Sequence, residues 1–198
     1  MKVKYLPRFV VGVDEVGRGP LAGPVAVGAL LSTSNMLRHY VMIKESKQLS
    51  PTQREEWYRR IVLSRGKELR FAVSFVGVNI IDTKGIVFAI RLALSRSLKK
   101  LNVNPNNCTV LLDGGLYAPK KYLQQQTIIR GDATETVIAM ASVVAKVLRD
   151  KRMVRLDKKY PKYGFAIHKG YGTKAHYQAL KKHGLSSEHR RSFCKNLL

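Results

Sequence analysis

Acidic residues stand directly after apolar segments at two places in this chain. Asp14 and Glu15 follow Phe9–Val13, and Asp113 follows Val110–Leu112 and precedes two glycines. Ionised carboxylates beside buried strands cost several kcal/mol unless they are paired or bound to a metal. The simpler alternatives are a strand end whose acids face water or a basic side chain and, after the second segment, an Asp-Gly turn.

Two more acids flank a helical pattern further along the chain. Asp132 follows a strand-like stretch and precedes the pattern, and Asp150 ends it. Asp132 together with Glu135 also fits an acidic capping box, and Asp150 also fits a surface ion pair. Several acids at the strand ends of one sheet suit hard divalent cations, which take oxygen ligands. Two such ions can activate a water and stabilise the leaving oxygen in phosphoryl transfer.

The remaining residues that could bind a metal fit no metal pattern. His168, His176 and His189 lack the spacing of a zinc site, so we expect them to pack or to contact nucleic acid. Cys108 and Cys194 form neither a metal knuckle nor a disulfide framework. We expect both to be reduced thiols.

The elements that must position the acids alternate between β-rich runs and helical patterns. Strands are expected over 9–13, 24–31, 71–76, 109–112 and 127–129. Helices are expected from the Ser50-Pro51 start to about Leu63, from about Lys84 to Leu101, along the stripe from Val137 to Leu148, and over Lys174–Lys182. Strands first and then alternating helix and strand favour a mixed α/β sheet.

The composition of the whole chain points to a polyanionic partner. Its 198 residues include 36 Lys and Arg against 13 Asp and Glu, a formal net charge of +23. Basic surfaces gain affinity for phosphate chains by releasing condensed counterions. The length suits one domain over 1–198, with a basic helical subregion from about 155 to 198. Because neither a membrane-spanning run nor a secretory signal is evident, we expect a cytoplasmic protein without membrane contact.

One segment carries a specific family resemblance. Gly12–Pro24 reads GVDEVGRGPLAGP and resembles the N-terminal signature of ribonuclease HII, the type 2 ribonuclease H of prokaryotes. Further blocks match in order at Ser46–Ser50, Leu112–Gly114, Gly131-Asp132 with Ala141–Asp150, Tyr163–Phe165 with His168–Tyr171, and His189–Phe193. The resemblance spans about residues 9 to 193.

This resemblance implies a fold, an activity and a metal site. The fold would be ribonuclease H-like, a central mixed five-stranded sheet flanked by helices with a helical C-terminal part. The enzyme would hydrolyse the RNA strand of RNA/DNA hybrids and nick 5′ of single ribonucleotides in duplex DNA, leaving 3′-hydroxyl and 5′-phosphate ends. Asp14, Glu15, Asp113 and Asp132 would hold Mg²⁺ or Mn²⁺, two ions with substrate bound, and Asp150 is a near-site candidate.

The resemblance also implies substrate contacts. The loop Gly17-Arg18-Gly19 would read the 2′-hydroxyl at the RNA–DNA junction, and glycines let a backbone approach that closely. Tyr171 would contact the neighbouring sugar and disfavour pure RNA. We expect four further residues to face phosphates, namely Ser46, Lys47, Lys169 and Arg190. The alternatives are a plain tight turn with a solvent-facing Arg18, a packing tyrosine and solvated surface side chains.

Two positions depart from the family pattern. Glu45 stands where Asp is usual before Ser-Lys, and Arg130 stands where Lys is usual before Gly-Asp. Both keep the sign of the charge, but Lys and Arg present their donors differently, which leaves the phosphate contacts less defined. The start of the chain close to the first strand and the Arg between two glycines favour type HII over the related type HIII.

Two rival functions are also compatible with parts of the sequence. A non-catalytic basic binder, such as a ribosome-associated protein, explains the charge but leaves the four strand-end acids unexplained. Another nuclease or a transposase of the same fold is disfavoured by the Gly-Arg-Gly loop and Tyr171. We expect a monomer, and a contact with a sliding clamp is open because no clamp-binding tail is evident.

Overall fold

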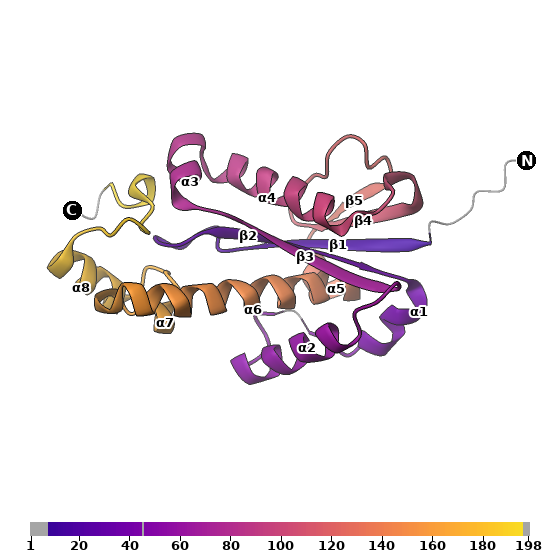
Figure 1. The fold of residues 1–198 in the computed structure, drawn as a ribbon, viewed down its shortest axis with the longest axis horizontal. Helices are drawn as coiled ribbons and strands as arrows, with labels where there is room; N and C mark the ends of the chain where they lie inside the picture. Colours follow the sequence, from indigo (N-terminus) through magenta and orange to yellow (C-terminus); the bar gives the residue numbers. More distant parts are fainter. Residues whose placement is uncertain (1–7, 45, 196–198) are drawn as a thin grey trace, which may run out of the picture.

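The five strands form one mixed sheet at the centre of the computed structural model, which describes residues 8–44 and 46–195. They are β1 (Phe9–Val16), β2 (Val25–Ser32), β3 (Leu69–Val76), β4 (Cys108–Asp113) and β5 (Gln125–Ile128). Their order is β3-β2-β1-β4-β5, with β1, β2 and β3 antiparallel and β4 and β5 parallel to β1 (Figure 1). The expectation of a mixed five-stranded sheet is confirmed.

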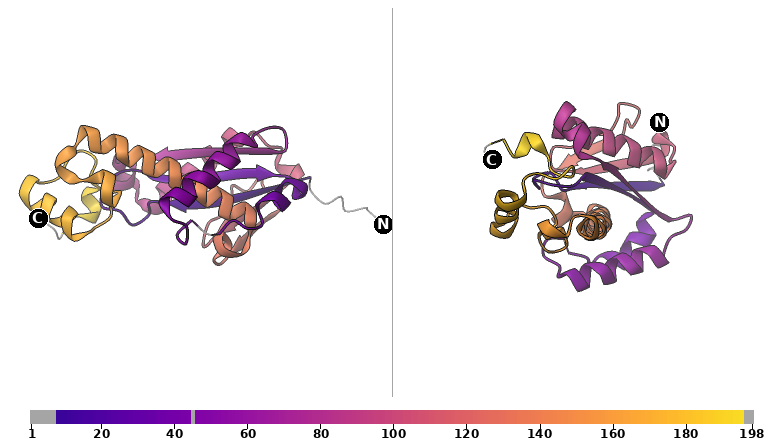
Figure 2. Two further views of the ribbon diagram at one scale, coloured as in Figure 1. Left: turned by 90° about the horizontal axis from the view of Figure 1, so that it is seen from below. Right: turned by 60° about the vertical axis from the view of Figure 1, so that its left-hand side comes forward.

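Helices cover both faces of this sheet. The α-helices are α1 (Ser34–Leu37), α2 (Pro51–Leu63), α3 (Val78–Lys84), α4 (Ile86–Leu101), α5 (Gly131–Thr134), α6 (Thr136–Lys159), α7 (Phe165–His168) and α8 (Lys174–His183). Helix α4 packs on one face, and α6 packs on the other with α2 outside it (Figures 1 and 2). No helix within the described ranges is both long and apolar enough to cross a membrane.

Two glycines let α6 approach the sheet closely. A Cβ at Gly12 of β1 would lie 2.3 Å from the carbonyl carbon of Val137, and one at Gly28 of β2 would lie 2.6 Å from the Ala141 carbonyl oxygen. Real Cβ atoms do not approach backbone that closely, so larger residues would push the helix away. This contact sets how near the side chains of α6 come to the end of β1.

The elements differ from the sequence expectations in three respects. The helix expected from about Lys84 to Leu101 is α4, and a separate helix that was not predicted, α3, precedes it and ends at Gly85, which has a φ of 81°. Helix α6 continues to Lys159, so Asp150 lies within it rather than at its end. The capping-box alternative for Asp132 is wrong, because this residue lies inside α5, and the residue preceding α6 makes no side-chain cap bond.

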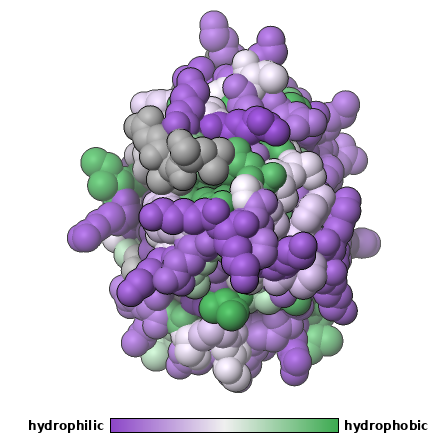
Figure 3. All heavy atoms as spheres, turned by 90° about the vertical axis from the view of Figure 1, so that its left-hand side faces the viewer, coloured by the Kyte–Doolittle hydropathy of each residue, from purple (hydrophilic) through white to green (hydrophobic). Residues whose placement is uncertain are grey.

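The C-terminal part folds back onto the loop that follows β1. Helices α7 and α8 lie at the far end of α6, and hydrophilic side chains cover most of this face (Figures 2 and 3). Ala22 pairs with His189 in an isolated β-bridge, and Leu21 and Ala22 both donate backbone hydrogen bonds to the Gly170 carbonyl. Three segments distant in sequence thus share one backbone hydrogen-bond network.

Candidate active site

Four of the predicted acids converge at one edge of the sheet. Strands β1 and β4 run parallel with Val13 opposite Leu112, so Asp14 and Asp113 emerge at the same level. Glu15 follows on β1, and its backbone N–H donates to Asp14 Oδ1 at 2.7 Å. Asp132 arrives from α5, and its N–H donates to Asp113 Oδ1 at 3.4 Å.

The electrostatics of these acids are unfavourable in the absence of cations. Asp14 is buried, and its pKa is raised to about 8, chiefly by desolvation. A hydrogen bond with Ser142 opposes this shift, while the charges of Asp113, Glu15 and Asp132 add to it. Burial also raises the pKa of Glu15, and the nearby Arg18 guanidinium opposes that rise. A site that resists ionisation in this way favours any cation that binds its carboxylates.

Basic side chains already contact two of the acids. Arg18 Nη1 lies 3.5 Å from Glu15 Oε1, and Lys47 Nζ lies 3.8 Å from Asp132 Oδ2. Both basic side chains are largely exposed, at 60% and 81%. Within the described residues, no three acidic, histidine or cysteine side chains are gathered into a complete metal-binding group. The acids lie near one another, but their carboxylates are not arranged as a complete set of metal ligands.

A cavity of about 230 Å³ opens beside Asp14 and Glu15. Its wall brings together most of the predicted substrate residues, namely Gly17, Arg18, Gly19, Ser46, Lys47 and Tyr171. Ser142 and Lys146 of α6 complete it. Asp113 and Asp132 adjoin the acids but are not part of this wall, and neither Lys169 nor Arg190 reaches it. The sequence therefore located the cavity but not the contribution of α6.

The Gly-Arg-Gly loop is shaped by its first glycine. Gly17 has a φ of 85°, and a Cβ there would lie 2.1 Å from Arg149 Nε. A side chain at this position would meet both backbone strain and a buried guanidinium. Gly19 has open space around it, which leaves its backbone approachable from the cavity.

Arg190 has a different role from the phosphate contact that we expected. Its side chain is fully buried and donates to the carbonyl oxygens of Gly17 at 2.7 Å, Arg18 at 2.9 Å and Gly23 at 3.0 Å. Burial and, to a lesser extent, the charge of the neighbouring Arg149 lower its pKa to about 9. The buried guanidinium therefore braces the Gly-Arg-Gly loop through three backbone carbonyls.

The remaining two phosphate candidates, Ser46 and Lys169, already make hydrogen bonds within the protein. Ser46 is buried, and its hydroxyl lies 2.8 Å from that of Ser142, which bonds to Asp14. Lys169 has a left-handed backbone with φ 52°, and its ammonium donates to the Ala166 carbonyl. Lys47 is the most exposed of the four, and Lys169 is partly buried at the second groove.

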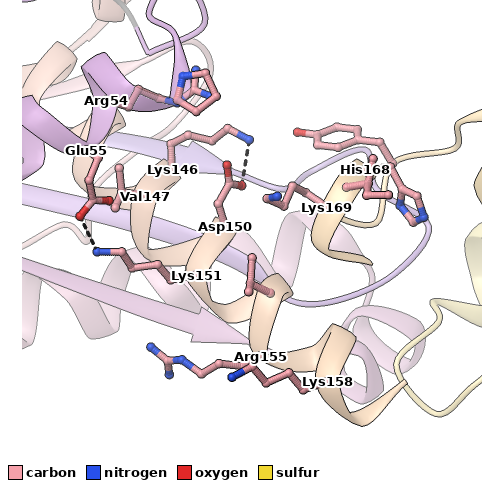
Figure 4. Close-up of a pocket in the computed structure, with 14 residues that line it drawn as sticks. Arg54, Glu55, Lys146, Val147, Asp150, Lys151, Arg155, Lys158, His168 and Lys169 are labelled. Atoms are coloured by element: carbon pink, nitrogen blue, oxygen red, sulfur yellow. Dashed lines mark hydrogen bonds and ion pairs between the residues drawn. The ribbon is translucent and has the colours of Figure 1, made fainter. Parts of the chain in front are cut away.

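A second groove of about 670 Å³ lies between α2, α6 and α7 (Figure 4). It joins the first cavity at Lys146 and Tyr171, which line both. Lys146 pairs with Asp150 at 2.9 Å, which confirms the ion pair expected for this acid, although both side chains are only 20% exposed. Lys151 pairs with Glu55 at 2.8 Å across the groove.

Sequence reasoning missed the functional face of α6. Ser142, Lys146 and Arg149 lie on one side of this helix, and each touches the acids, the cavity or the glycine loop. Arg149 is fully buried and donates to the carbonyls of Pro24 and Lys169. Their spacing of three and four residues was the available signal, because such positions share a helix face.

The comparisons with known proteins agree with this architecture. The family model of ribonuclease HII matches residues 11–196. The ribonuclease HII of Endomicrobium trichonymphae is 44% identical over 184 residues, covering 93% of this chain and 84% of the relative. That of Coxiella burnetii (strain RSA 493 / Nine Mile phase I) is 41% identical over 185 residues, covering 93% and 88%.

Solved structures show the same fold. The ribonuclease HII in a PCNA complex from Archaeoglobus fulgidus has a TM-score of 0.76 at 23% identity, with 94% of each chain covered. The ribonuclease H2 of Pyrococcus horikoshii OT3 has a TM-score of 0.71 at 24% identity, with 96% of each chain covered. The fold is therefore that of the ribonuclease H-like nucleases. The chain belongs to the ribonuclease HII family and is a ribonuclease H endonuclease.

Proposed function

We propose that this enzyme hydrolyses the RNA strand of RNA/DNA hybrids and nicks duplex DNA 5′ of single ribonucleotides, leaving 3′-hydroxyl and 5′-phosphate ends. The observation that carries the proposal is the buried Asp14, which sits among three other acids in a chain of net charge +23. The acidic site and the basic surface around it have two separate tasks. The surface attracts the phosphate backbone, and the acids hold the cations that hydrolysis requires.

We propose that Asp14, Glu15, Asp113 and Asp132 hold Mg²⁺ or Mn²⁺, two ions when substrate is bound. The donor set fits these metals, because hard divalent cations take carboxylate oxygens. Burial, together with the charges of the neighbouring acids, raises the pKa of Asp14, so a cation bound at its carboxylate would favour the ionised form. When bound, the metal supplies an activated water and stabilises the leaving oxygen. A ribonuclease HIII of similar fold has been solved in complex with Mn²⁺.

The basic partners of the acids have a second role in this proposal. Arg18 and Lys47 occupy Glu15 and Asp132 through long, exposed contacts. Such contacts are weak in water, so they would oppose the binding of a divalent cation only slightly. Both side chains border the cavity, where a guanidinium and an ammonium not engaged by the acids would bind the phosphates flanking the cleaved bond.

Recognition of the ribose rests on two features of the cavity wall. The backbone of Gly17–Gly19 offers polar groups without a shielding side chain, which suits a 2′-hydroxyl contact. Tyr171 is 41% exposed at the junction of both cavities, where its ring can lie against a sugar. We further propose a monomeric enzyme acting in the cytoplasm, a setting that suits its two buried free cysteines.

A nicking assay tests the proposed reaction. A DNA duplex with one ribonucleotide, an all-DNA duplex and an RNA/DNA hybrid are incubated with Mg²⁺ or Mn²⁺. We expect cutting of the first and third, and Asp113→Asn should lose it while the exposed-site control Glu56→Gln retains it. Undiminished nicking by Asp113→Asn would show that the metal residues are misassigned. Equal cutting of the all-DNA duplex would contradict ribose recognition.

A further inference from the structure

Three histidines lie buried beneath Tyr171. His168, His176 and His189 are 8%, 0% and 2% exposed. The rings of His168 and His176 stack with centroids 4.2 Å apart, and the ring of His189 lies 5.2 Å from that of His176. None of the three points into the cavity beside Asp14, so the proposed reaction does not use them directly.

The hydrogen bonds of two rings form a directed chain. The Ser186 backbone N–H donates to His189 Nδ1 at 2.9 Å, so this nitrogen carries no proton and Nε2 carries it. His189 Nε2 lies 3.0 Å from His176 Nε2, which must therefore accept. The proton of neutral His176 is then on Nδ1, which donates to the Tyr171 carbonyl at 2.9 Å.

The third ring, that of His168, accepts a hydrogen bond from Gly170, the residue before Tyr171. The Gly170 N–H donates to His168 Nδ1 at 3.2 Å, so His168 donates from Nε2 to the Tyr163 carbonyl at 2.7 Å. Burial lowers the pKa of His176 and lowers that of His189 to about 4, which keeps both rings neutral. The backbone on both sides of the Gly170–Tyr171 peptide is thus anchored by imidazoles of defined tautomer.

We propose that His176, oriented by His189, is a positioning residue that holds Tyr171 against the substrate through the hydrogen bond from Nδ1 to the Tyr171 carbonyl. This inference rests on the proposed contact between Tyr171 and the sugar. The Gly170 carbonyl accepts from Leu21 and Ala22, so the same turn is tied to the chain that follows the Gly-Arg-Gly loop. The two ribose-recognising elements therefore share one anchored backbone.

Two variants of His176 separate hydrogen bonding from packing. His176→Asn places an amide N–H near the position of Nδ1 but removes the ring. His176→Phe keeps a ring against His168 but cannot donate. Both are assayed on the single-ribonucleotide duplex at a temperature where circular dichroism shows them folded. We expect Phe to lower kcat/KM about tenfold, the effect of one lost hydrogen bond, and Asn to stay within about threefold. The reverse order would overturn the proposal.

A double-mutant cycle identifies the residue through which His176 acts. In a Tyr171→Ala background, His176→Phe should have no further effect on kcat/KM, because the group it positions is gone. An undiminished tenfold loss would show that His176 acts elsewhere. If Tyr171→Ala by itself leaves kcat/KM unchanged, the proposed sugar contact fails, and the positioning role fails with it.

A measurement without substrate tests the anchoring itself. Long-range ¹H–¹⁵N correlation spectra of the unsubstituted protein assign the protonated nitrogen of each ring. We expect Nδ1–H for His176 and Nε2–H for His168 and His189. The opposite tautomer at His176 would refute the anchor whatever the activity. The expected tautomers together with an inactive enzyme would place the failure in the proposed function instead.

Discussion

At the scale of single residues, Asp14 occupies an electrostatically unfavourable position. Its carboxylate is buried beside Asp113 and Glu15, and the hydrogen bond with Ser142 does not offset the desolvation. Residues that lower stability in this way persist where function needs them. Stability and activity should therefore respond in opposite directions when this charge is removed.

Asp14→Asn is expected to stabilise the metal-free protein by about 2 kcal/mol, because the amide avoids the cost of burying a carboxylate. The same change should lower nicking by at least about 100-fold through loss of a metal ligand. Thermal unfolding in EDTA and the nicking assay measure the two effects. A lower melting temperature than that of the unsubstituted protein would contradict the electrostatic account.

At the scale of elements, the site depends on how closely α6 lies against β1. The contact at Gly12 sets this distance, and Ser142 and Lys146 reach the cavity from the same helix. The parallel pairing of β1 and β4 brings Asp14 and Asp113 together, so one sheet edge and one helix build most of the site. A small displacement of α6 would therefore move Ser142 and Lys146 relative to the acids at the sheet edge.

Gly12→Ala should destabilise the protein by about 1–3 kcal/mol, because the added methyl overlaps the α6 backbone. Activity should fall more than stability alone explains, since the shift also moves Ser142 relative to Asp14. Gly66→Ala is the matched control, because a Cβ there meets nothing within 4 Å. Urea unfolding and kcat/KM are measured for both. Equal stability of the two variants would show that α6 can accommodate the added methyl group without strain.

At the scale of the whole molecule, the net charge of +23 governs association with nucleic acid. Each phosphate that the protein neutralises releases counterions, so affinity falls steeply with salt. The structure divides the basic residues into those that face solvent, such as Lys47, and those that brace the interior, such as Arg190. Only the first class should contribute to salt dependence.

Lys47→Gln should therefore reduce the slope of log Kd against log salt by about one, the effect of one lost phosphate contact. Arg190→Gln should leave this slope unchanged while lowering the melting temperature, because its guanidinium bonds only to loop carbonyls. Fluorescence anisotropy with labelled duplex across a salt series in Ca²⁺ measures both slopes. A shallower slope for Arg190→Gln would place this residue on a phosphate after all.

The stability of the whole fold should also depend on pH through its buried histidines. His189 has a native pKa of about 4 against an ordinary value of 6.5, so below pH 6.5 only the unfolded chain takes up this proton. The contribution of His189 to stability is therefore fully present above pH 6.5 and falls by up to about 3 kcal/mol as the pH falls to 4, whereas the raised pKa of Asp14 acts in the opposite direction. Urea unfolding between these pH values checks this, and His189→Gln should flatten the dependence. An unchanged pH profile in that variant would exclude His189 as its source.

The sequence by itself determined the sheet, the helices of its two faces and the acids at the strand ends. These features follow from local patterns, since alternation and helical spacing bury apolar side chains wherever they occur. The Gly12–Pro24 and Leu112–Gly114 blocks carried the family, and each begins on one of two adjacent parallel strands and continues into the loop that follows. Such local sequence patterns can be recognised without knowing how the helices and strands pack.

Only the tertiary structure decided what Arg190, Ser46 and the histidines do. Arg190 lies far from Gly17 in sequence, and in a basic tail its side chain resembles any surface arginine until the fold buries it under the loop. The direction of the His189–His176–Tyr171 chain depends on which backbone groups meet each ring nitrogen. Contacts between distant segments arise from packing, and the residue types alone do not specify which partners meet.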